Sequence, residues 1–255
     1  MNIFVLLKQT FDTEERITIQ NGEISEDGVK FVMNPYDEYA VEEALLQRDE
    51  HGGTVTVVGV GPDRTAEALR TALAMGADEA VLIQNDGMET DEYSISRLLA
   101  AYLEKQSYDL ILGGNFSVDS GGGQVAVRLA QLLGLPHTSS ITKLTVNGQK
   151  ASVERDAEGD TESLEVALPA VFTAQQGLNE PRYPSLPGIM KAKKKPFQHI
   201  TPAELGIDPD EAAAKTKRVS LSLPPQRQAG RILQGDYAHQ AAELVNLLRT
   251  EAKLI

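Results

Sequence analysis

A run of three glycines, Gly121, Gly122 and Gly123, is the part of this sequence that points most directly to ligand binding. It follows a short apolar run at residues 110–112 and precedes an amphipathic stretch that starts after Gln124. Glycines leave backbone N–H groups uncovered and let a ligand approach closely. The first turn of a helix adds about half a positive charge. Together these features predict an anion site suited to a nucleotide phosphate.

Each local pattern also has a purely structural interpretation. The glycines can form a flexible turn, and the segment matches neither a Walker A loop nor GxGxxG. Asn34 and Pro35 are typical of a capped helix start, with or without a ligand. The Asp119 carboxylate suits either a hydrogen bond to a ribose hydroxyl or the capping of a turn. We find no catalytic nucleophile or acid–base pair in the sequence, so the residues alone indicate a nucleotide-binding protein and leave these alternatives open.

The composition excludes several other chemistries. The 255 residues include no cysteine, which excludes disulfides, thiolate metal sites and cysteine nucleophiles. The four histidines are widely scattered, so we expect no metal site. A formal net charge of −13 makes nucleic acid an unfavourable partner. With no run of about 18 apolar residues and no signal-like N-terminal segment, we expect a cytoplasmic protein without membrane insertion.

Strand and helix patterns alternate through residues 1–135. The stretches between the apolar runs follow the i, i+3, i+4, i+7 spacing of amphipathic helices, and Gly76 and Gly134 mark helix ends. This alternation predicts a doubly wound, mostly parallel α/β sheet with helices on both faces. The runs that predict buried strands are residues 3–7, 55–60, 80–83 and 110–112.

In such a sheet, ligands bind beyond the carboxyl ends of the strands. Four loops are expected to meet there, and the glycine run belongs to the last of them. They are residues 8–10, 33–37, 60–62 and 113–124.

Two β-hairpins are predicted outside the alternating pattern. Residues 17–33 pair ITIQ with GVKFVM across an NGE turn, and residues 140–155 form a hairpin around Asn147-Gly148. Residues 163–168 and 170–173 predict further strands. We expect a nucleotide-binding α/β domain at residues 1–198.

The C-terminal part, residues 199–255, is predicted to form an extended arm that ends in an amphipathic helix. Residues 206–230 contain few large apolar side chains, and ordering such a segment in open solvent is costly. We therefore expect the arm to pack on another subunit.

A proline-punctuated segment with a basic run precedes the arm. Leu186, Ile189 and Met190 stand beside the sequence KAKKK at residues 191–195. A basic run is usually a solvated face, but exposed apolar residues in a loop also suit a contact with an acidic partner.

At these residues the chain resembles the β (small) subunit of electron transfer flavoproteins. The resemblance covers essentially the whole chain, and its most specific parts are the last two quoted. The matching pieces are NPYDEYAVEEAL at 34–45, RTALAMGADEAVLI at 70–83, DLILGGNFSVDSGGGQ at 109–124, VERDAEGDTESLEVALPAVFTA at 153–174 and QQGLNEPRYPSLPGIMKAKKKP at 175–196.

The resemblance implies an adenine nucleotide α-hydrolase-like fold and a heterodimer with a larger α subunit that holds most of the FAD site. It implies a structural AMP in the β subunit and an arm that wraps the α subunit. It also implies an electron carrier rather than an enzyme. Electrons would come from acyl-CoA dehydrogenases and related flavin dehydrogenases in fatty acid β-oxidation. They would leave through a quinone oxidoreductase to the respiratory chain.

The resemblance also assigns residues. The partner-recognition loop would be residues 183–195, with Leu186 as its hydrophobic anchor and Tyr183, Ile189, Met190, Lys191, Lys193, Lys194 and Lys195 around it. The AMP contacts would be Leu6, Asn34, Pro35, Tyr36, Asp37, Val60, Gly114, Asn115, Phe116, Ser117, Val118, Asp119, Ser120, Gly121, Gly122, Gly123 and Gln124.

The chain departs from the family pattern at three places. Ser120, Gly121 and Gly122 replace the residues that often follow Asp119, so that only backbone remains there to contact a ligand. Ala126-Val127 replace a common Gly-Pro, and Thr13 stands where some members place a tyrosine near the flavin ring. Two alternatives stay open: an electron-bifurcating form with a second FAD in place of AMP, and a free-standing adenine-nucleotide-binding enzyme.

Overall fold

The computed structural model of the chain describes residues 1–85, 87–208, 210–227 and 229–255. It forms two compact units. Met1–Ile17 and Ser25–Val219 make up the first, and Thr18–Ile24 and Ser220–Ile255 make up the second. The boundary predicted after residue 198 falls inside the first unit, because residues 197–200 form a strand of its sheet.

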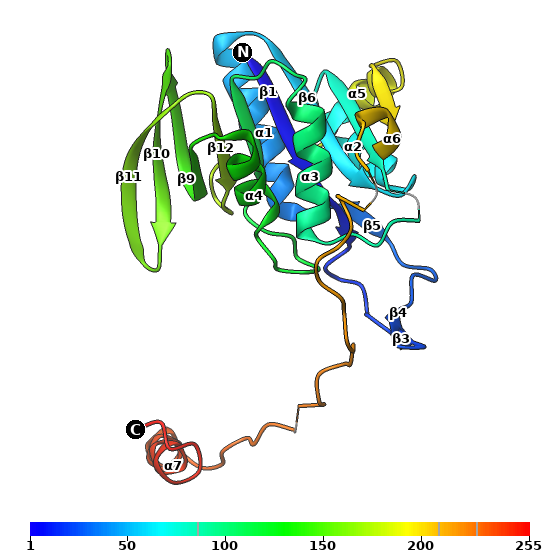
Figure 1. Cartoon of the computed structure of the whole chain (residues 1–255). Coiled ribbons are helices and arrows are strands. Elements are labelled where there is room, and N and C mark those ends of the chain that lie inside the picture. Colours follow the sequence, from blue (N-terminus) through cyan, green and yellow to red (C-terminus); the bar gives the residue numbers. More distant parts are fainter. Residues whose placement is uncertain (86, 209, 228) are drawn as a thin grey trace. The chain divides into compact units, whose positions relative to one another are not determined.

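A nine-stranded sheet is the centre of the first unit (Figure 1). Its order is β11-β10-β9-β12-β8-β1-β6-β7-β13, and within the described sheet only β10 runs antiparallel to its neighbours. The mostly parallel sheet is therefore confirmed. The strands are β1 (Asn2–Leu7), β6 (Thr54–Gly61), β7 (Glu79–Gln84), β8 (Leu110–Gly114), β9 (His137–Asn147), β10 (Lys150–Ala157), β11 (Asp160–Ala167), β12 (Ala170–Ala174) and β13 (Phe197–Ile200).

Helices cover both faces of this sheet, as the alternating pattern predicts (Figure 1). Successive side chains of β1 point to opposite faces: Ile3 and Val5 join a core with α1 and α2, whereas Phe4 and Leu6 join a core with α3 and α4. The helices are α1 (Pro35–His51), α2 (Thr65–Met75), α3 (Glu92–Leu103), α4 (Val125–Leu133), α5 (Leu186–Ala192), α6 (Pro202–Leu205) and, in the second unit, α7 (Tyr237–Thr250).

The predicted helix ends are confirmed. Pro35 lies in the first turn of α1, where its missing N–H costs no helical hydrogen bond. Gly76 ends α2, and Gly134 ends α4 in the left-handed conformation at φ 66°.

The predicted pairing within residues 17–33 is wrong in part. Asn21 and Gly22 both have positive φ and close a tight turn between β3 (Ile19–Gln20) and β4 (Glu23–Ile24). The later strand, β5 (Phe31–Met33), instead pairs with β2 (Gln9–Phe11). The Phe11 and Phe31 rings lie 5.0 Å apart across that pair, so aromatic packing supports it. The hairpin around Asn147-Gly148 is confirmed by β9 and β10.

The segment predicted to be an arm from residue 206 is partly packed on the first unit. Ile207 and Ala212 are buried in the core beneath α3, and Asp91 accepts hydrogen bonds from the backbone N–H groups of Lys215 and Thr216. The last helix is confirmed as α7, where none of the residues is buried.

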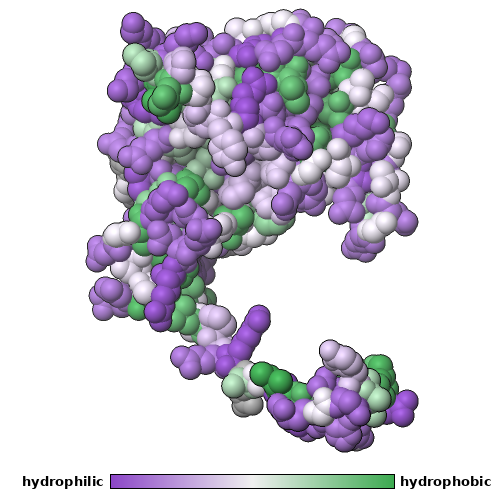
Figure 2. Space-filling model, turned by 180° about the vertical axis from the view of Figure 1, so that it is seen from behind, coloured by the Kyte–Doolittle hydropathy of each residue, from purple (hydrophilic) through white to green (hydrophobic). Residues whose placement is uncertain are grey.

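The surface mixes polar and apolar residues. In the space-filling view, hydrophilic residues predominate on the visible face and hydrophobic residues form separate patches (Figure 2). Among the described residues, no helix is both long enough and apolar enough to cross a lipid bilayer.

Two neighbouring leucines of α1 test the core. Leu45 is fully buried against the sheet, whereas Leu46 is 42% exposed. We expect Leu45→Ala to lower the free energy of unfolding by about 2–5 kcal/mol, because it leaves a cavity. The matched control Leu46→Ala should change it by less than about 0.5 kcal/mol. Urea unfolding of both variants measures this difference, and equal effects would contradict the assigned face of α1.

Candidate functional site

The direction in which successive strands are added to the sheet reverses at β1. From β1 the chain continues to β6 and β7 on one side, and β8 and β12 lie on the other. At such a switch point the loops that leave adjacent strands diverge to opposite faces and open a crevice at the carboxyl ends. The loops after β1 and β8 are therefore the parts of the chain best placed to hold a ligand.

Asp37 ties these two loops to the start of α1. Its carboxylate accepts the backbone N–H of Lys8 at 2.6 Å, the Asn34 amide at 2.9 Å and the backbone N–H of Gly114 at 3.1 Å. Burial raises the pKa of Asp37 to about 7, against the opposing effect of these three donors. A β-carbon at position 114 would collide with Asp37 and Tyr36, so glycine is required for this approach.

Asn34 has a different role from the one its position indicates. It is the N-cap residue of α1, but its side chain makes no capping hydrogen bond. Its amide nitrogen donates to Asp37 and to the carbonyl of Phe116 at 3.0 Å, and its amide oxygen accepts the N–H of Val118 at 3.2 Å. Asn34 therefore fastens the β8–α4 loop to α1. The rings of Tyr36 and Phe116, 4.2 Å apart, reinforce the same contact.

Lys8 adds a positive charge to the site; it lies in the first predicted crevice loop, residues 8–10, but is not among the AMP contacts that the resemblance implies. Its ammonium lies 2.7 Å from Asp119 Oδ1 and 3.2 Å from Ser117 Oγ, both in the β8–α4 loop. Burial raises the pKa of Asp119, but the hydrogen bonds and charge of Lys8 outweigh it and hold that pKa below its usual value. A lysine directly after a buried strand is the sequence signal that could have identified it.

The glycine run leaves backbone donors free at the start of α4. Gly121 and Gly123 have φ of 65° and 59°, a conformation that favours glycine. Within the described part of the chain, the N–H groups of Gly122, Gly123 and Gln124 have no hydrogen-bond acceptor, and no side chain caps α4. Three consecutive free donors at a helix N-terminus suit a phosphoryl group.

The remaining predicted contacts lie in the strands and loops around this cluster. Leu6 is buried within β1, and Val60 is half-buried near the end of β6. The backbone N–H of Asn115 donates to Ala174, and its side chain accepts from Thr173, which connects the loop to β12. The structure therefore brings together the loops after β1 and β8 and the start of α1.

The segment predicted as a partner-recognition loop is a short helix over residues 186–192. Ser185 caps α5 by accepting the N–H of Gly188, and Pro187 lies in its first turn, which explains why the segment is not a loop. Tyr183 is 94% exposed and Leu186 79%, and Ile189, Met190, Lys191, Lys193 and Lys194 are also exposed. The ammonium of Lys195, in contrast, donates to the carbonyls of Leu73 and Ala77 at the end of α2.

A groove of about 500 Å³ lies between these two regions. Tyr36 and Val118 line it from the switch-point cluster (residues 8, 34–37 and 114–124), and Tyr183 lines it from the α5 segment (residues 183–195). Thr13 lies on the same groove. Residues predicted to contact the nucleotide and residues predicted to contact the partner therefore line the same groove.

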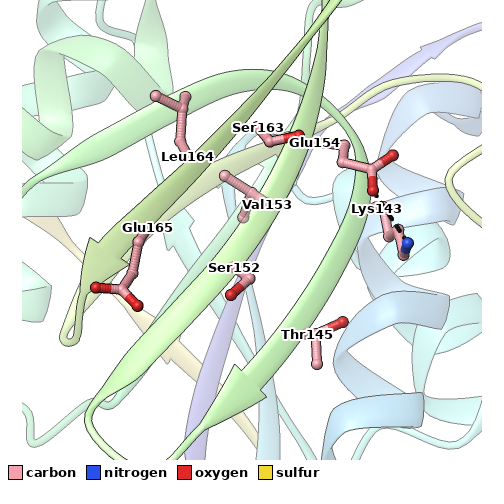
Figure 3. A pocket seen from close by; sticks show the side chains of 8 residues that line it. All are labelled: Lys143, Thr145, Ser152, Val153, Glu154, Ser163, Leu164 and Glu165. Atoms are coloured by element: carbon pink, nitrogen blue, oxygen red, sulfur yellow. Dashed lines mark hydrogen bonds and ion pairs between the residues drawn. The ribbon is translucent and has the colours of Figure 1, made fainter.

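A second hollow, of about 300 Å³, lies on one face of β9, β10 and β11 (Figure 3). Its lining includes Lys143 and Glu154, which form an ion pair at 3.0 Å. It shares no residue with the predicted nucleotide contacts, and paired charges occupy its rim.

Comparison with known proteins matches residues 21–205 to the electron transfer flavoprotein domain. The chain is 56% identical over 257 residues to the electron transfer flavoprotein subunit beta of Bacillus subtilis, and the alignment covers all of both chains. It is 40% identical to the subunit beta of Syntrophomonas wolfei, with 100% of this chain and 98% of the relative covered. It is 38% identical to that of Homo sapiens, with 90% and 91% covered.

The chain belongs to the electron transfer flavoprotein β-subunit family. The resemblance given by the sequence motifs is thereby confirmed. The contacts described above show which residues of this family member can be changed to test the predicted nucleotide and partner contacts.

The titration of Asp37 gives a pH-dependent prediction for this electron transfer flavoprotein subunit. Because its pKa is raised in the folded chain, the folded state binds more protons than the unfolded state between about pH 4 and pH 7. Asp37 therefore favours folding most at the acidic end, and this contribution is lost as pH rises through 7.

We expect the stability of the wild type relative to Asp37→Asn to fall between pH 5 and pH 8, by on the order of a few kcal/mol. Urea unfolding of both proteins at the two pH values measures the difference, and the neutral variant serves as the control for all other titrating groups. A relative stability that is constant or rises with pH would contradict the raised pKa.

Proposed function

We propose that this chain is the β subunit of a heterodimeric electron transfer flavoprotein that holds AMP as a structural ligand. Its α partner would hold most of the FAD site. The heterodimer would accept electrons from acyl-CoA dehydrogenases and related flavin dehydrogenases and pass them through a quinone oxidoreductase to the respiratory chain. The observation that carries this proposal is the full-length similarity to proteins named electron transfer flavoprotein subunit beta.

The switch-point cluster fits a nucleotide monophosphate. The free N–H groups of residues 122–124 would hold the phosphoryl oxygens, and Lys8, which contacts Ser117 and Asp119 of the same loop, would supply a positive charge. Asp119 and the backbone of residues 114–118 would lie along the nucleoside. These residues bind and orient a ligand, and none of them is assigned a bond-making role.

FAD, when bound in the heterodimer, supplies the redox chemistry. In this chain, residues 13, 36 and 183 line the groove next to the switch-point cluster, and we assign them no redox step. The β subunit is therefore proposed to be an electron carrier component rather than an enzyme. The cytoplasmic location expected from the sequence remains a prediction.

The α5 segment fits a surface for rapid, reversible docking. Leu186 and Met190 expose apolar area, and the exposed Lys191, Lys193 and Lys194 follow directly in the chain and add positive charge in an otherwise acidic protein. An apolar anchor supplies binding energy, while rim charges chiefly raise the association rate with an acidic partner. Such a complex exchanges quickly, as an electron carrier with several donors requires.

The nucleotide content of the heterodimer tests the proposed ligand. We expect chromatography of the denatured complex to yield one FAD and one AMP. Two FAD and no AMP would overturn the AMP assignment and favour the electron-bifurcating alternative.

The same assay can use neighbouring glycines as a test and its control. Gly114→Ala should reduce AMP content, because its β-carbon collides with Asp37 and Tyr36. Gly113→Ala should retain AMP, because its β-carbon meets only Leu6 at ordinary contact distance.

The exposed anchor gives a kinetic prediction. Leu186→Ala should slow electron acceptance from a reduced acyl-CoA dehydrogenase on the order of tenfold, because it removes the most exposed leucine of the segment. Flavin content should be unchanged. Stopped-flow reduction of the heterodimer measures the rate, and Leu164→Ala on β11 is the control for an exposed leucine elsewhere. Equal rates for wild type and Leu186→Ala would count against the docking role.

A further inference from the structure

The exposed side chains of the α5 segment stand on a piece of chain that is fastened at both ends. Between β12 and α5, residues 175–185 form no helix or strand in the described structure. A segment of this kind would be mobile if nothing held it. The contacts that hold it come from the partly buried surfaces of α1 and α2.

Glu42 on α1 is the principal attachment point. Its side chain is only 6% exposed, and its carboxylate faces the guanidinium of Arg182. Arg182 Nε lies 2.9 Å from Oε2 and Nη2 lies 2.9 Å from Oε1, while the backbone N–H of Arg182 donates to Oε2 at 3.1 Å. Two parallel charge-assisted hydrogen bonds fix the direction of the guanidinium as well as its distance. The added backbone bond fixes the main chain directly before Tyr183.

A second attachment lies beside the first, at Tyr39 and Glu43. The side chain of Asn179 donates to the carbonyl of Tyr39 at 3.0 Å and to Glu43 Oε2 at 3.1 Å. Gln47 donates to the other oxygen of Glu43 at 2.9 Å, so this buried carboxylate is also satisfied. Residues 39, 42 and 43 share one face of α1, because they are three and four positions apart. This face therefore holds the chain that leads into the α5 segment.

The other end of the segment is attached to α2. Gly188 of α5 approaches so closely that a β-carbon there would collide with the carbonyl of Ala74. Lys195 donates to the carbonyls of Leu73 at 2.9 Å and Ala77 at 2.5 Å. Between these two attachments, Tyr183 and Leu186 remain the most exposed apolar residues of the segment.

We propose that Glu42 and Arg182 are positioning residues for donor recognition, and that they present Tyr183 and Leu186 in an ordered arrangement before the dehydrogenase arrives. This inference rests on the proposed function, in which the segment docks the electron donor. A surface that is ordered in advance loses less conformational entropy on binding. The pair would therefore act on the affinity for the donor and leave the electron-transfer step inside the docked complex unchanged.

Arg182→Lys in the heterodimer tests this proposal. Lysine keeps the charge but cannot form the two parallel hydrogen bonds to Glu42. We expect the KM of a reduced acyl-CoA dehydrogenase for the heterodimer to rise on the order of tenfold. The kcat at saturation, the FAD and AMP content and the rate of chemical reduction should stay the same. Hydrogen exchange should accelerate in residues 177–190.

Arg64→Lys is the matched control. The Arg64 side chain has nearly the same exposure as that of Arg182, 37% against 38%, but its partner Glu26 is 54% exposed. This control should change neither KM nor hydrogen exchange in the segment.

If Arg182→Lys prevents assembly of the heterodimer, Glu42→Gln tests the same contact, because it removes the negative charge that faces Arg182. The double variant should raise KM no more than the larger single effect, because both changes disrupt the same contact, while the longer Arg182–Asp49 ion pair at 3.7 Å needs only a positive charge, which lysine keeps. An unchanged KM in variants that assemble would overturn the proposal, and so would a KM rise matched by equal losses in kcat and nucleotide content.

If Leu186→Ala leaves the transfer rate unchanged, the docking function itself fails. If Leu186→Ala slows transfer while both pair variants keep the wild-type KM, only the positioning role fails.

Discussion

The arrangement of the switch-point loops depends on one buried carboxylate. Asp37 is 5% exposed, and a carboxylate in such a place is tolerated only when donors surround it. Its donors come from the end of β1, the residue before α1 and the end of β8, so satisfying it brings three separate parts of the chain together. Gly114 can reach it because it has no side chain. The donors that remain free are those of residues 122–124, further along the same loop.

Helix α1 connects the switch-point cluster to the α5 segment. Asp37 lies in its first turn, and Glu42 lies five residues later, about 8 Å along the helix axis. The same stretch therefore carries the acid that brings the switch-point loops together and the acid that fixes Arg182. Both are buried on a helix whose apolar side chains, such as Leu45, pack on the sheet. A rigid element with two polar attachments therefore sets the distance between the proposed ligand site and the proposed partner surface.

Much of this architecture follows from the sequence, because hydrophobic periodicity reports burial directly. The core strands, the helix ends at Gly76 and Gly134 and the meeting of the loops after β1 and β8 were all predictable. The partners of individual polar side chains were not. Asn34 has the sequence context of a cap, yet its amide crosses to residues 116 and 118, and this choice depends on tertiary distances.

The errors have a common cause in long-range pairing. Strand β5 has two possible antiparallel partners, β3 and β2. The tight turn at Asn21 and Gly22 pairs β3 with β4, so β5 pairs with β2. The sequence around Glu42 is typical of an acid on the solvent-facing side of a helix. In the structure, Arg182, 140 residues away, supplies its counter-ion. Position on the helix cannot reveal such a partner. The short helix α5 was missed because prolines and exposed apolar residues favour a loop, although Ser185 and Pro187 are also a helix start.

The free N–H groups impose a limit on what the proposed nucleotide site can select. Backbone donors recognise phosphoryl oxygens and are indifferent to the rest of the ligand. Discrimination between AMP and a larger dinucleotide must then come from the space and side chains around the nucleoside. Lys8 and Asp119 already neutralise one another at 2.7 Å, so an added phosphoryl group would compete with Asp119 for the ammonium. A phosphate monoester carries about −1.5 to −2 at pH 7, close to the total charge of the two phosphodiester groups of a dinucleotide such as FAD, so charge does not separate the two ligands. The choice between AMP and FAD in the function that we propose therefore depends on the space around the nucleoside rather than on charge.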